Sequence, residues 1–263
     1  MYRDKKLALV TGSTLGIGFA IAEALVNDGA DVIINGRSPE RVQEAVDRIN
    51  SNKGSDTEAI PGVGDLSTAE GVESLISRFP EVDVLVNNLG IFEAKPFAEI
   101  TDADWLRFFE VNVLSGVRLS RHYLPKMIDR NWGRIVFISS ESAIMIPSEM
   151  MHYGMTKTAQ LSISRGLAEM TAGTAVTVNS VLPGPTASEG VQTFVEQLAR
   201  AANKTPEEME EEFFRTMRPT SLLKRFAKPE EIASVVAFVC SPEASAINGS
   251  ALRAEGGLVR SIL

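Results

Sequence analysis

Tyr153 and Lys157 are the first candidates for chemistry in this sequence. The stretch HYGMTK at 152–157 places one of only three tyrosines four residues before a lysine, and side chains at this spacing face the same way on a helix. A free tyrosine has a pKa of about 10, too high for an effective base near neutrality, and a nearby ammonium stabilises the phenolate. The pair could therefore move a proton, although such pairs are also common as plain neighbours on a helix surface.

A glycine-rich turn, TGSTLGIG at 11–18, lies between a predicted strand and a predicted helix. Gly12, Gly16 and Gly18 allow the backbone to turn tightly and to approach a pyrophosphate, and the turn also contains Ser13 and Ile17. The helix that follows offers free N–H groups and the positive end of its dipole to an anion. The turn therefore predicts a dinucleotide site, with the spacing GxxxGxG rather than GxGxxG.

Arg37 bears on the choice of dinucleotide. The second predicted strand ends in IINGRS and carries no acidic residue that would bond the adenosine ribose hydroxyls of NAD. Arg37 could pair with the 2′-phosphate of NADP. NADP(H) is therefore favoured over NAD(H), the alternative being that Arg37 is solvated and selects neither cofactor.

Short apolar runs alternate with longer amphipathic stretches along the 263 residues. The apolar runs predict strands at about 6–12, 31–36, 57–63, 82–88, 134–140, 175–182 and 250–257. The amphipathic stretches predict helices at about 18–30, 38–52, 68–79, 102–129, 152–172 and 229–240. This alternation predicts an α/β protein, with a single doubly wound Rossmann-type parallel sheet of about seven strands and helices on both faces. We expect one domain over 1–263.

Residues 185–218 differ from the rest, because they are polar, acidic and helical in pattern. They follow a predicted strand end, which is where doubly wound sheets bind ligands. We expect a helical substrate lid here in preference to a fixed surface pair of helices.

Composition excludes several classes of function. The net charge of −8 and the pI of about 5.0 argue against partners such as nucleic acid or an anionic membrane surface. No apolar run approaches a membrane span of about 20 residues, and MYRDKKLALV at the N-terminus lacks the apolar stretch of a signal peptide. His122 and His152 are the only histidines, so no metal site is expected, and Cys240 has no cysteine partner. These features agree with a cytoplasmic protein.

A series of short motifs appears in a fixed order. It comprises TGSTLGIG (11–18), GDLS (64–67), NNLG (87–90), FEVN (109–112), ISS (138–140), YGMTK (153–157) and PGPTAS (183–188). Together they resemble the short-chain dehydrogenase/reductase family, and within it the 3-oxoacyl-[acyl-carrier-protein] reductase-like members, from Lys6 to Gly257. The resemblance implies an NAD(P)-dependent oxidoreductase that transfers a hydride between a nicotinamide cofactor and a carbonyl or secondary alcohol.

The resemblance also implies the catalytic residues. Tyr153 would be the acid or base, and Lys157 would lower its pKa and bind the nicotinamide ribose. Ser140, with Ser139 as its rival, would bind the substrate oxygen. Asn112 would complete a proton relay with Lys157 through water.

Further positions carry over to the cofactor. Asp65 and Leu66 would hold the adenine, and Asn88 with Gly90 would line its ribose. The nicotinamide amide would be positioned by Pro183, Gly184 and Thr186. The family further implies a homotetramer, or less often a dimer, built around the helices at 102–129 and 152–172 and the C-terminal segment.

The substrate is predicted from the stretch ESAIMIPSEMMH at 141–152. Its apolar residues suggest one wall of the site, with a core or subunit interface as the equal alternative: Ile144, Met145, Ile146, Met150 and Met151. No basic residue lies in MTAGTAVTVN at 170–179, whereas an acidic carrier protein would favour one near the site. We therefore favour a small or medium apolar ketone or alcohol. The alternatives are 3-oxoacyl-[acyl-carrier-protein] reduction and a non-catalytic NADP-binding sensor.

Overall fold

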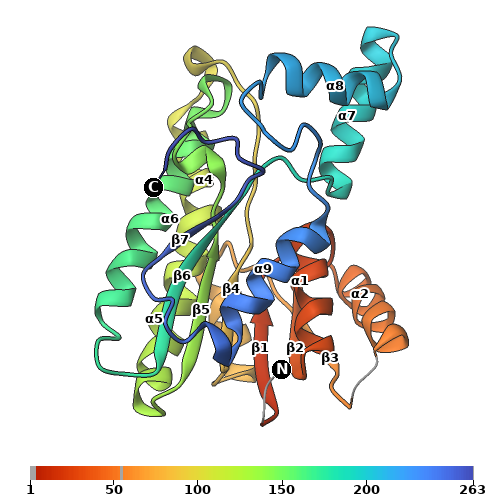
Figure 1. The fold of residues 1–263 in the computed structure, drawn as a ribbon. Helices are drawn as coiled ribbons and strands as arrows, with labels where there is room; N and C mark the ends of the chain where they lie inside the picture. Colours follow the sequence, from red (N-terminus) through yellow and green to blue (C-terminus); the bar gives the residue numbers. More distant parts are fainter. Residues whose placement is uncertain (1–3, 54–55, 263) are drawn as a thin grey trace.

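A parallel sheet forms the centre of the molecule in the computed structural model, which describes residues 4–53 and 56–262. Its seven strands run in the order β3-β2-β1-β4-β5-β6-β7, and each pairs in parallel with its neighbours (Figure 1). They are β1 (Lys6–Val10), β2 (Ala30–Gly36), β3 (Ala59–Val63), β4 (Val84–Asn87), β5 (Gly133–Ile138), β6 (Val176–Pro183) and β7 (Ala251–Ala254). The predicted α/β fold class is confirmed.

Helices connect the strands and cover both faces of the sheet (Figure 1). They are α1 (Gly16–Asn27), α2 (Pro39–Asn52), α3 (Ala69–Arg78), α4 (Asp102–Phe109), α5 (Ser115–Asp129), α6 (Met151–Glu169), α7 (Glu189–Ala202), α8 (Pro206–Thr216) and α9 (Pro229–Cys240). No helix in residues 4–53 and 56–262 is long and apolar enough to cross a membrane.

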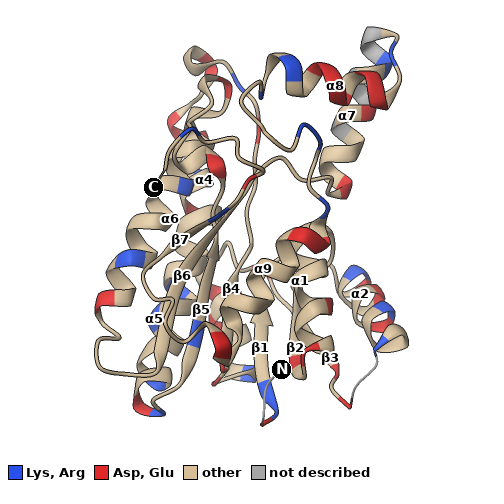
Figure 2. Ribbon diagram, viewed as in Figure 1, with Lys and Arg blue, Asp and Glu red and all other residues tan. Residues whose placement is uncertain are grey.

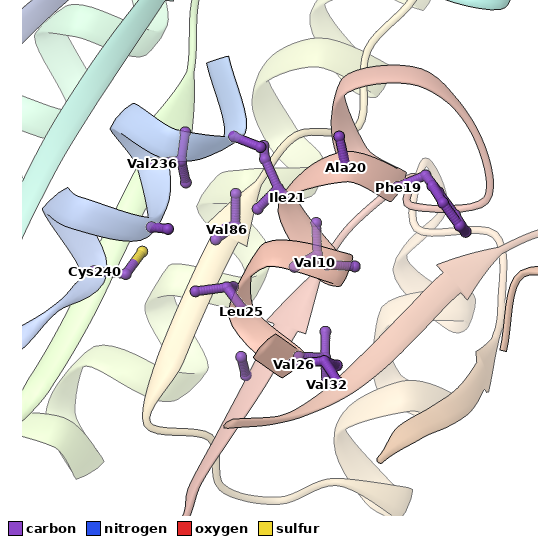
Figure 3. Close-up of a cluster of buried hydrophobic side chains, with 14 of the residues drawn as sticks. Val10, Phe19, Ala20, Ile21, Leu25, Val26, Val32, Val86, Val236 and Cys240 are labelled. Carbon is purple, nitrogen blue, oxygen red and sulfur yellow. The ribbon is translucent and has the colours of Figure 1, made fainter. Parts of the chain in front are cut away.

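Two hydrophobic cores result from the alternation of side chains along the strands. Val10 joins the core beneath α1, α2 and α9, whereas the adjacent Leu9 joins the core beneath α3, α5 and α6. Figure 3 shows the first core, in which Val10 and Val86 of the sheet lie against Leu25 of α1. Both faces of the sheet are therefore buried, which is why the strands read as nearly continuous apolar runs.

Cys240 ends α9 within the first core and is fully buried (Figure 3). Burial raises the pKa of its thiol to about 12, so little of the reactive thiolate forms.

Most predicted boundaries agree with the structure to within a few residues, but the predicted helix at 102–129 is interrupted. A π-helical turn at Glu110–Leu114 separates α4 from α5. Asn112, a predicted catalytic residue, lies in this turn, and such turns widen a helix locally and redirect its side chains.

The strand order reverses at β1, because β2 lies on one side of β1 and β4 on the other. Ligands of doubly wound sheets bind at such a point, beyond the carboxyl ends of the strands. The segment predicted as a lid lies beyond this edge as α7 and α8 (Figure 1), and acidic residues are frequent along α8 (Figure 2).

Candidate active site

The glycine loop between β1 and α1 has the geometry of an anion cradle. Gly12 and Gly16 have φ angles of 60° and 58°, a region that glycine adopts without strain. Leu15 precedes α1 and makes no side-chain cap, so the N–H groups of the first turn remain available to a ligand. The loop is thus preformed for a phosphate group.

Asn88 clamps this loop from the end of β4. Its Nδ2 donates to the carbonyl oxygens of Thr11 and Gly12 at 2.9 and 3.0 Å. A Cβ atom added to Gly18 would lie 2.4 Å from Asn88 Nδ2, so only glycine fits there. Asn88, which was predicted to line the ribose, therefore also holds the glycine loop in place, a structural role that the sequence motif alone did not indicate.

A pocket of about 310 Å³ lies beside the loop and between the ends of β2 and β3. Arg37, Asp65 and Leu66, which were predicted to contact the adenosine end of a dinucleotide, line this pocket. The side chain of Leu66 is buried in the core beneath α3, α5 and α6, so its backbone is the part that a ligand would meet. Asp65 Oδ1 accepts hydrogen bonds from the N–H and hydroxyl of Ser67.

Arg41 also lines this pocket and was missed in the sequence. It lies four residues after Arg37, in the first turn of α2, where its N–H donates to the Ser38 hydroxyl. Two guanidinium groups therefore border the pocket. The four-residue spacing was the signal that could have identified the second one.

A second pocket, of about 300 Å³, contains the predicted catalytic side chains. Ser140 follows β5, and Tyr153 and Lys157 lie one turn apart on α6. The predicted cofactor positions around the same space are Ile17, Asn88, Gly90, Pro183, Gly184 and Thr186. Residues from five separate stretches of the sequence thus meet at one edge of the sheet.

Ser139 and Ser140 were rivals for the substrate oxygen, and their hydroxyl groups have different partners. Ser139 Oγ donates to the carbonyl oxygen of Lys157 at 2.8 Å, which anchors α6 to β5. Ser140 Oγ donates instead to a carboxylate oxygen of Glu141, and its position beside Tyr153 lowers the pKa of the phenol. This geometry favours Ser140 for the substrate oxygen.

The pKa of Tyr153 is nevertheless raised, opposite to the direction expected from a lysine neighbour. Desolvation of the phenol in the pocket is the main cause, and the negative charge of Glu141 adds to it. Lys157 is itself buried, and burial lowers its pKa to about 8. Its Nζ donates to the Ile138 carbonyl at 2.8 Å and lies 5.5 Å from the centre of the Tyr153 ring.

Asn112 is buried and holds the loop after β4. Its Oδ1 accepts from Ile91 N at 2.8 Å, while its Nδ2 donates to Ile91 O and to Thr156 Oγ1, both at 3.0 Å. Gln160, which the sequence did not point to, donates from its side-chain amide to the backbone carbonyl of Asn112 at 2.6 Å. A Cβ atom added to Gly90 would lie 3.5 Å from both Asn112 Oδ1 and Lys157 Nζ, so the relay candidates are neighbours.

The apolar wall expected from residues 144–151 was wrong for four of its five residues, and the alternative that these residues lie in a subunit interface stays a prediction. Ile144, Met145, Ile146 and Met151 are exposed, and of the five predicted residues Met150 alone lines the pocket. The short 3₁₀ turn at Glu141–Ala143 changes the direction of the chain before these residues. The apolar lining comes instead from Phe92, Phe213, Met217 and Phe226.

His152, next to Tyr153, does not line this pocket. It is fully buried, and its ring lies 4.0 Å from that of Phe108 and 6.0 Å from that of Trp105, measured between ring centres. Neither ring nitrogen has a hydrogen-bond partner within the described residues. Across residues 4–53 and 56–262, no group of three His, Cys, Asp or Glu side chains could hold a metal ion.

A doubly wound sheet, a phosphate cradle at its switch point and a Ser–Tyr–Lys cluster at the same edge define a nicotinamide-dependent dehydrogenase/reductase. The family model described as short chain dehydrogenase matches residues 6–199. The chain belongs to the short-chain dehydrogenase/reductase family and is an NAD(P)-dependent oxidoreductase.

Similar proteins extend over nearly the whole chain. An uncharacterized oxidoreductase of Bacillus subtilis (strain 168), YvaG, is 55% identical over 98% of this chain and 97% of that protein. The 3-oxoacyl-[acyl-carrier-protein] reductase FabG of Aquifex aeolicus is 34% identical over 96% of this chain and 97% of that protein. A solved structure of L-sorbose reductase from Gluconobacter frateurii, complexed with NADPH and L-sorbose, superposes with a TM-score of 0.91 at 30% identity, covering 98% of both chains.

Proposed function

We propose that this protein is an NADP(H)-dependent carbonyl reductase or alcohol dehydrogenase in which Tyr153 exchanges the proton. The observation that supports this most strongly is the convergence of Ser140, Tyr153 and Lys157 in one pocket. Ser140 binds the substrate oxygen, and Tyr153 donates a proton to it during reduction or removes one during oxidation. Lys157 stabilises the phenolate when its ammonium turns from the Ile138 carbonyl toward the phenol.

The residues present fit a nicotinamide dinucleotide. The glycine loop cradles the pyrophosphate, the pocket with Asp65 and Leu66 takes the adenine, and the end of β6 positions the nicotinamide amide. When bound, the cofactor supplies or accepts the hydride. The protein holds the carbonyl carbon near it and moves the matching proton at Tyr153.

NADP(H) is favoured over NAD(H) because two arginines, Arg37 and Arg41, border the adenosine pocket. A 2′-phosphate there can pair with both guanidinium groups. The L-sorbose reductase structure, which contains NADPH, is consistent with this choice.

The substrate is proposed to be a small or medium carbonyl compound, or the matching alcohol. The pocket of about 300 Å³ also contains the proposed nicotinamide positions, which limits the room for the substrate, and Phe92, Phe213 and Met217 favour an apolar part. Glu141 and Glu149 line the same pocket, and Arg218 lies against both of them. Reduction of 3-oxoacyl groups on a carrier protein is the second candidate, favoured by the 34% identity with FabG of Aquifex aeolicus.

Two larger features belong to this proposal. The segment 185–218 acts as a substrate lid, because Phe213 and Met217 of α8 and its end line the pocket. Leu106 and Phe109 on α4 are exposed and apolar, which favours a homotetramer or dimer packed along α4 and α5. Sedimentation equilibrium tests the assembly, and a monomer would contradict it.

The test of the function is NADPH consumption with a panel of carbonyl compounds, beside the variant Tyr153→Phe. The panel includes aliphatic, aromatic, steroid, sugar and 3-oxoacyl-thioester members. We expect turnover by the native protein and a loss of about 10²- to 10⁴-fold in the variant, since the phenol supplies acid–base catalysis. NADPH binding, followed by fluorescence, should survive. Turnover by Tyr153→Phe at the native rate would contradict the proposed function.

A further inference from the structure

Glu141 is a buried residue whose carboxylate is hydrogen-bonded to the candidate catalytic serine, Ser140. Its side chain and backbone together are 5% exposed. Its Oε2 accepts hydrogen bonds from the Ser140 hydroxyl, from Ser142 N at 2.7 Å and from Ser142 Oγ at 3.0 Å. A charge at such a depth requires compensation, because desolvation of an unpaired carboxylate is costly.

Arg218, which follows α8, supplies this compensation. Its Nε lies 3.4 Å from Glu141 Oε1, and its Nη1 lies 3.7 Å from Glu149 Oε1. The Arg218 side chain is 13% exposed, so solvent screens these contacts only in part. The segment proposed as a lid therefore places a positive charge against the carboxylate that holds Ser140.

The Ser140 hydroxyl has one proton to donate. Glu141 Oε2 accepts this hydrogen bond in the structure, whereas the Tyr153 phenolate and the substrate oxygen would both need the same donor. A carboxylate whose other oxygen faces a guanidinium is a weaker competitor for the proton than an unpaired one. Arg218 thus makes it easier for Ser140 to turn toward the reacting oxygen.

The same pair of charges acts on Tyr153 directly. The negative charge of Glu141 raises the pKa of Tyr153, and we expect the positive charge of Arg218 beside Glu141 to oppose this effect. His152, the adjacent residue, faces Phe108 and Trp105 instead of the phenol. The charged side chains that face this part of the pocket come from several segments and are Glu141, Glu149, Lys157 and Arg218.

We propose that Glu141 and Arg218 are positioning residues for the reaction: Glu141 orients the Ser140 hydroxyl, and Arg218, carried by the end of α8, neutralises Glu141 so that Ser140 and Tyr153 can act. The pair thereby couples the position of the α7–α8 segment to proton transfer. This inference rests on the proposed function but makes a separate claim, since the function requires only Ser140, Tyr153 and Lys157.

The experiment is a double-mutant cycle with Arg218→Gln, Glu141→Gln and both changes together. We expect Arg218→Gln to lower kcat by about 10- to 100-fold, since an uncompensated charge remains beside the reacting groups. Restoring neutrality with Glu141→Gln in the same chain should recover most of that loss. Arg218→Lys should keep most of the activity.

A second readout needs no substrate. The chain has three tyrosines, so the fluorine spectrum of fluorotyrosine-labelled protein, assigned with Tyr153→Phe, follows the ionisation of Tyr153. The midpoint should be highest in Arg218→Gln, intermediate in the native protein and lowest in Glu141→Gln. The double variant should lie between the two single variants. A structural role of the pair would not produce this order.

Arg215→Gln is the matched control, because Arg215 lies on α8, its side chain is 73% exposed and it forms an ion pair with Glu212 at 3.9 Å. It should leave kcat and the Tyr153 midpoint unchanged. The inference is overturned if Arg218→Gln matches Arg215→Gln, or if the two losses in the cycle simply add. Retained turnover in Tyr153→Phe would instead overturn the proposed function, while an ordered set of midpoints would still support the pair.

Discussion

The glycine loop and the Ser140–Tyr153–Lys157 cluster lie at the same edge of the sheet but satisfy their polar groups in opposite ways. In the loop, the donors and acceptors pair with one another: Asn88 bonds the carbonyls of Thr11 and Gly12, and the Gly12 N–H donates to Asn35 Oδ1 at 3.1 Å. The cradle is therefore complete before a ligand arrives.

The cluster beneath α8 contains ionisable groups whose surroundings work against their charged forms. Desolvation lowers the pKa of Lys157 to about 8 and raises that of Tyr153. Such perturbation is frequent at reacting sites and usually reduces folding stability. Under the proposed function, the loop is organised for binding by its geometry, whereas the cluster would transfer a proton at a cost in stability.

Lys157→Met gives the largest expected effect. Turnover should fall by about 10²-fold or more, because the phenolate loses its cation. The cofactor-free protein should nevertheless become more stable at pH 7, since lowering a lysine pKa from 10.5 to about 8 costs about 3 kcal/mol. Loss of the bond to Ile138 O offsets about 1 kcal/mol of this gain. Urea unfolding measures the difference.

The pH dependence of this stability difference has a definite sign. The unfolded chain binds the lysine proton more tightly than the folded one, so the native protein gains stability as pH rises from about 8 to 10.5. The advantage of Lys157→Met should therefore shrink over that window. Lys126→Met is the control, because Lys126 makes a similar carbonyl bond, to Pro80 at 2.8 Å, at the surface. Equal behaviour of the two variants would contradict the comparison.

Gly18→Ala should damage the loop instead of the cluster. The new Cβ atom would lie 2.4 Å from Asn88 Nδ2 and 2.5 Å from Gly12 O. We expect a destabilisation of about 1–3 kcal/mol and weaker NADPH binding by calorimetry. Gly166→Ala, also in a helix but with open space around the added atom, should be neutral or stabilising. If both variants bound NADPH as the native protein does, the loop would not be the cradle described.

Arg37→Ala combined with Arg41→Ala should change cofactor preference without affecting the cluster. The Kd for NADPH should rise by about 10- to 100-fold, since two charge-assisted contacts to a phosphate are lost, while the Kd for NADH should stay within about twofold of its native value. Arg48→Ala is the control, because Arg48 lies on the same helix but packs over the Phe19 ring. An equal loss for NADH and NADPH would remove the argument for the 2′-phosphate.

His152→Phe is expected to have the smallest effect. Both buried ring nitrogens lack partners within the described residues, which costs about 1 kcal/mol or more. A phenyl ring among Phe108 and Trp105 should raise the melting temperature slightly. Burial also lowers the pKa of His152, so the native protein should lose stability as pH falls below about 6.5, where the unfolded chain takes up the proton. If the stability of His152→Phe fell below pH 6.5 as steeply as that of the native protein, this prediction would be contradicted.

The sequence by itself determined the parts of this protein that depend on local pattern. Short continuous apolar runs predicted the strands, and apolar spacing with a period of 3.6 predicted the helices, because these strands bury both faces and these helices bury one. The glycine turn followed from its place between a strand and a helix, and the four-residue spacing of Tyr153 and Lys157 placed both on one side of α6.

Tertiary structure alone decided what surrounds these groups. Phe213 and Met217 reach the pocket from an acidic helix, whereas Ile144 and Met145 turn outward, since the direction of a loop is not encoded in its hydropathy. The direction of the Tyr153 pKa shift depends on desolvation and on Glu141. Such effects arise only when distant segments pack together, because burial and charge–charge distance are properties of the folded chain.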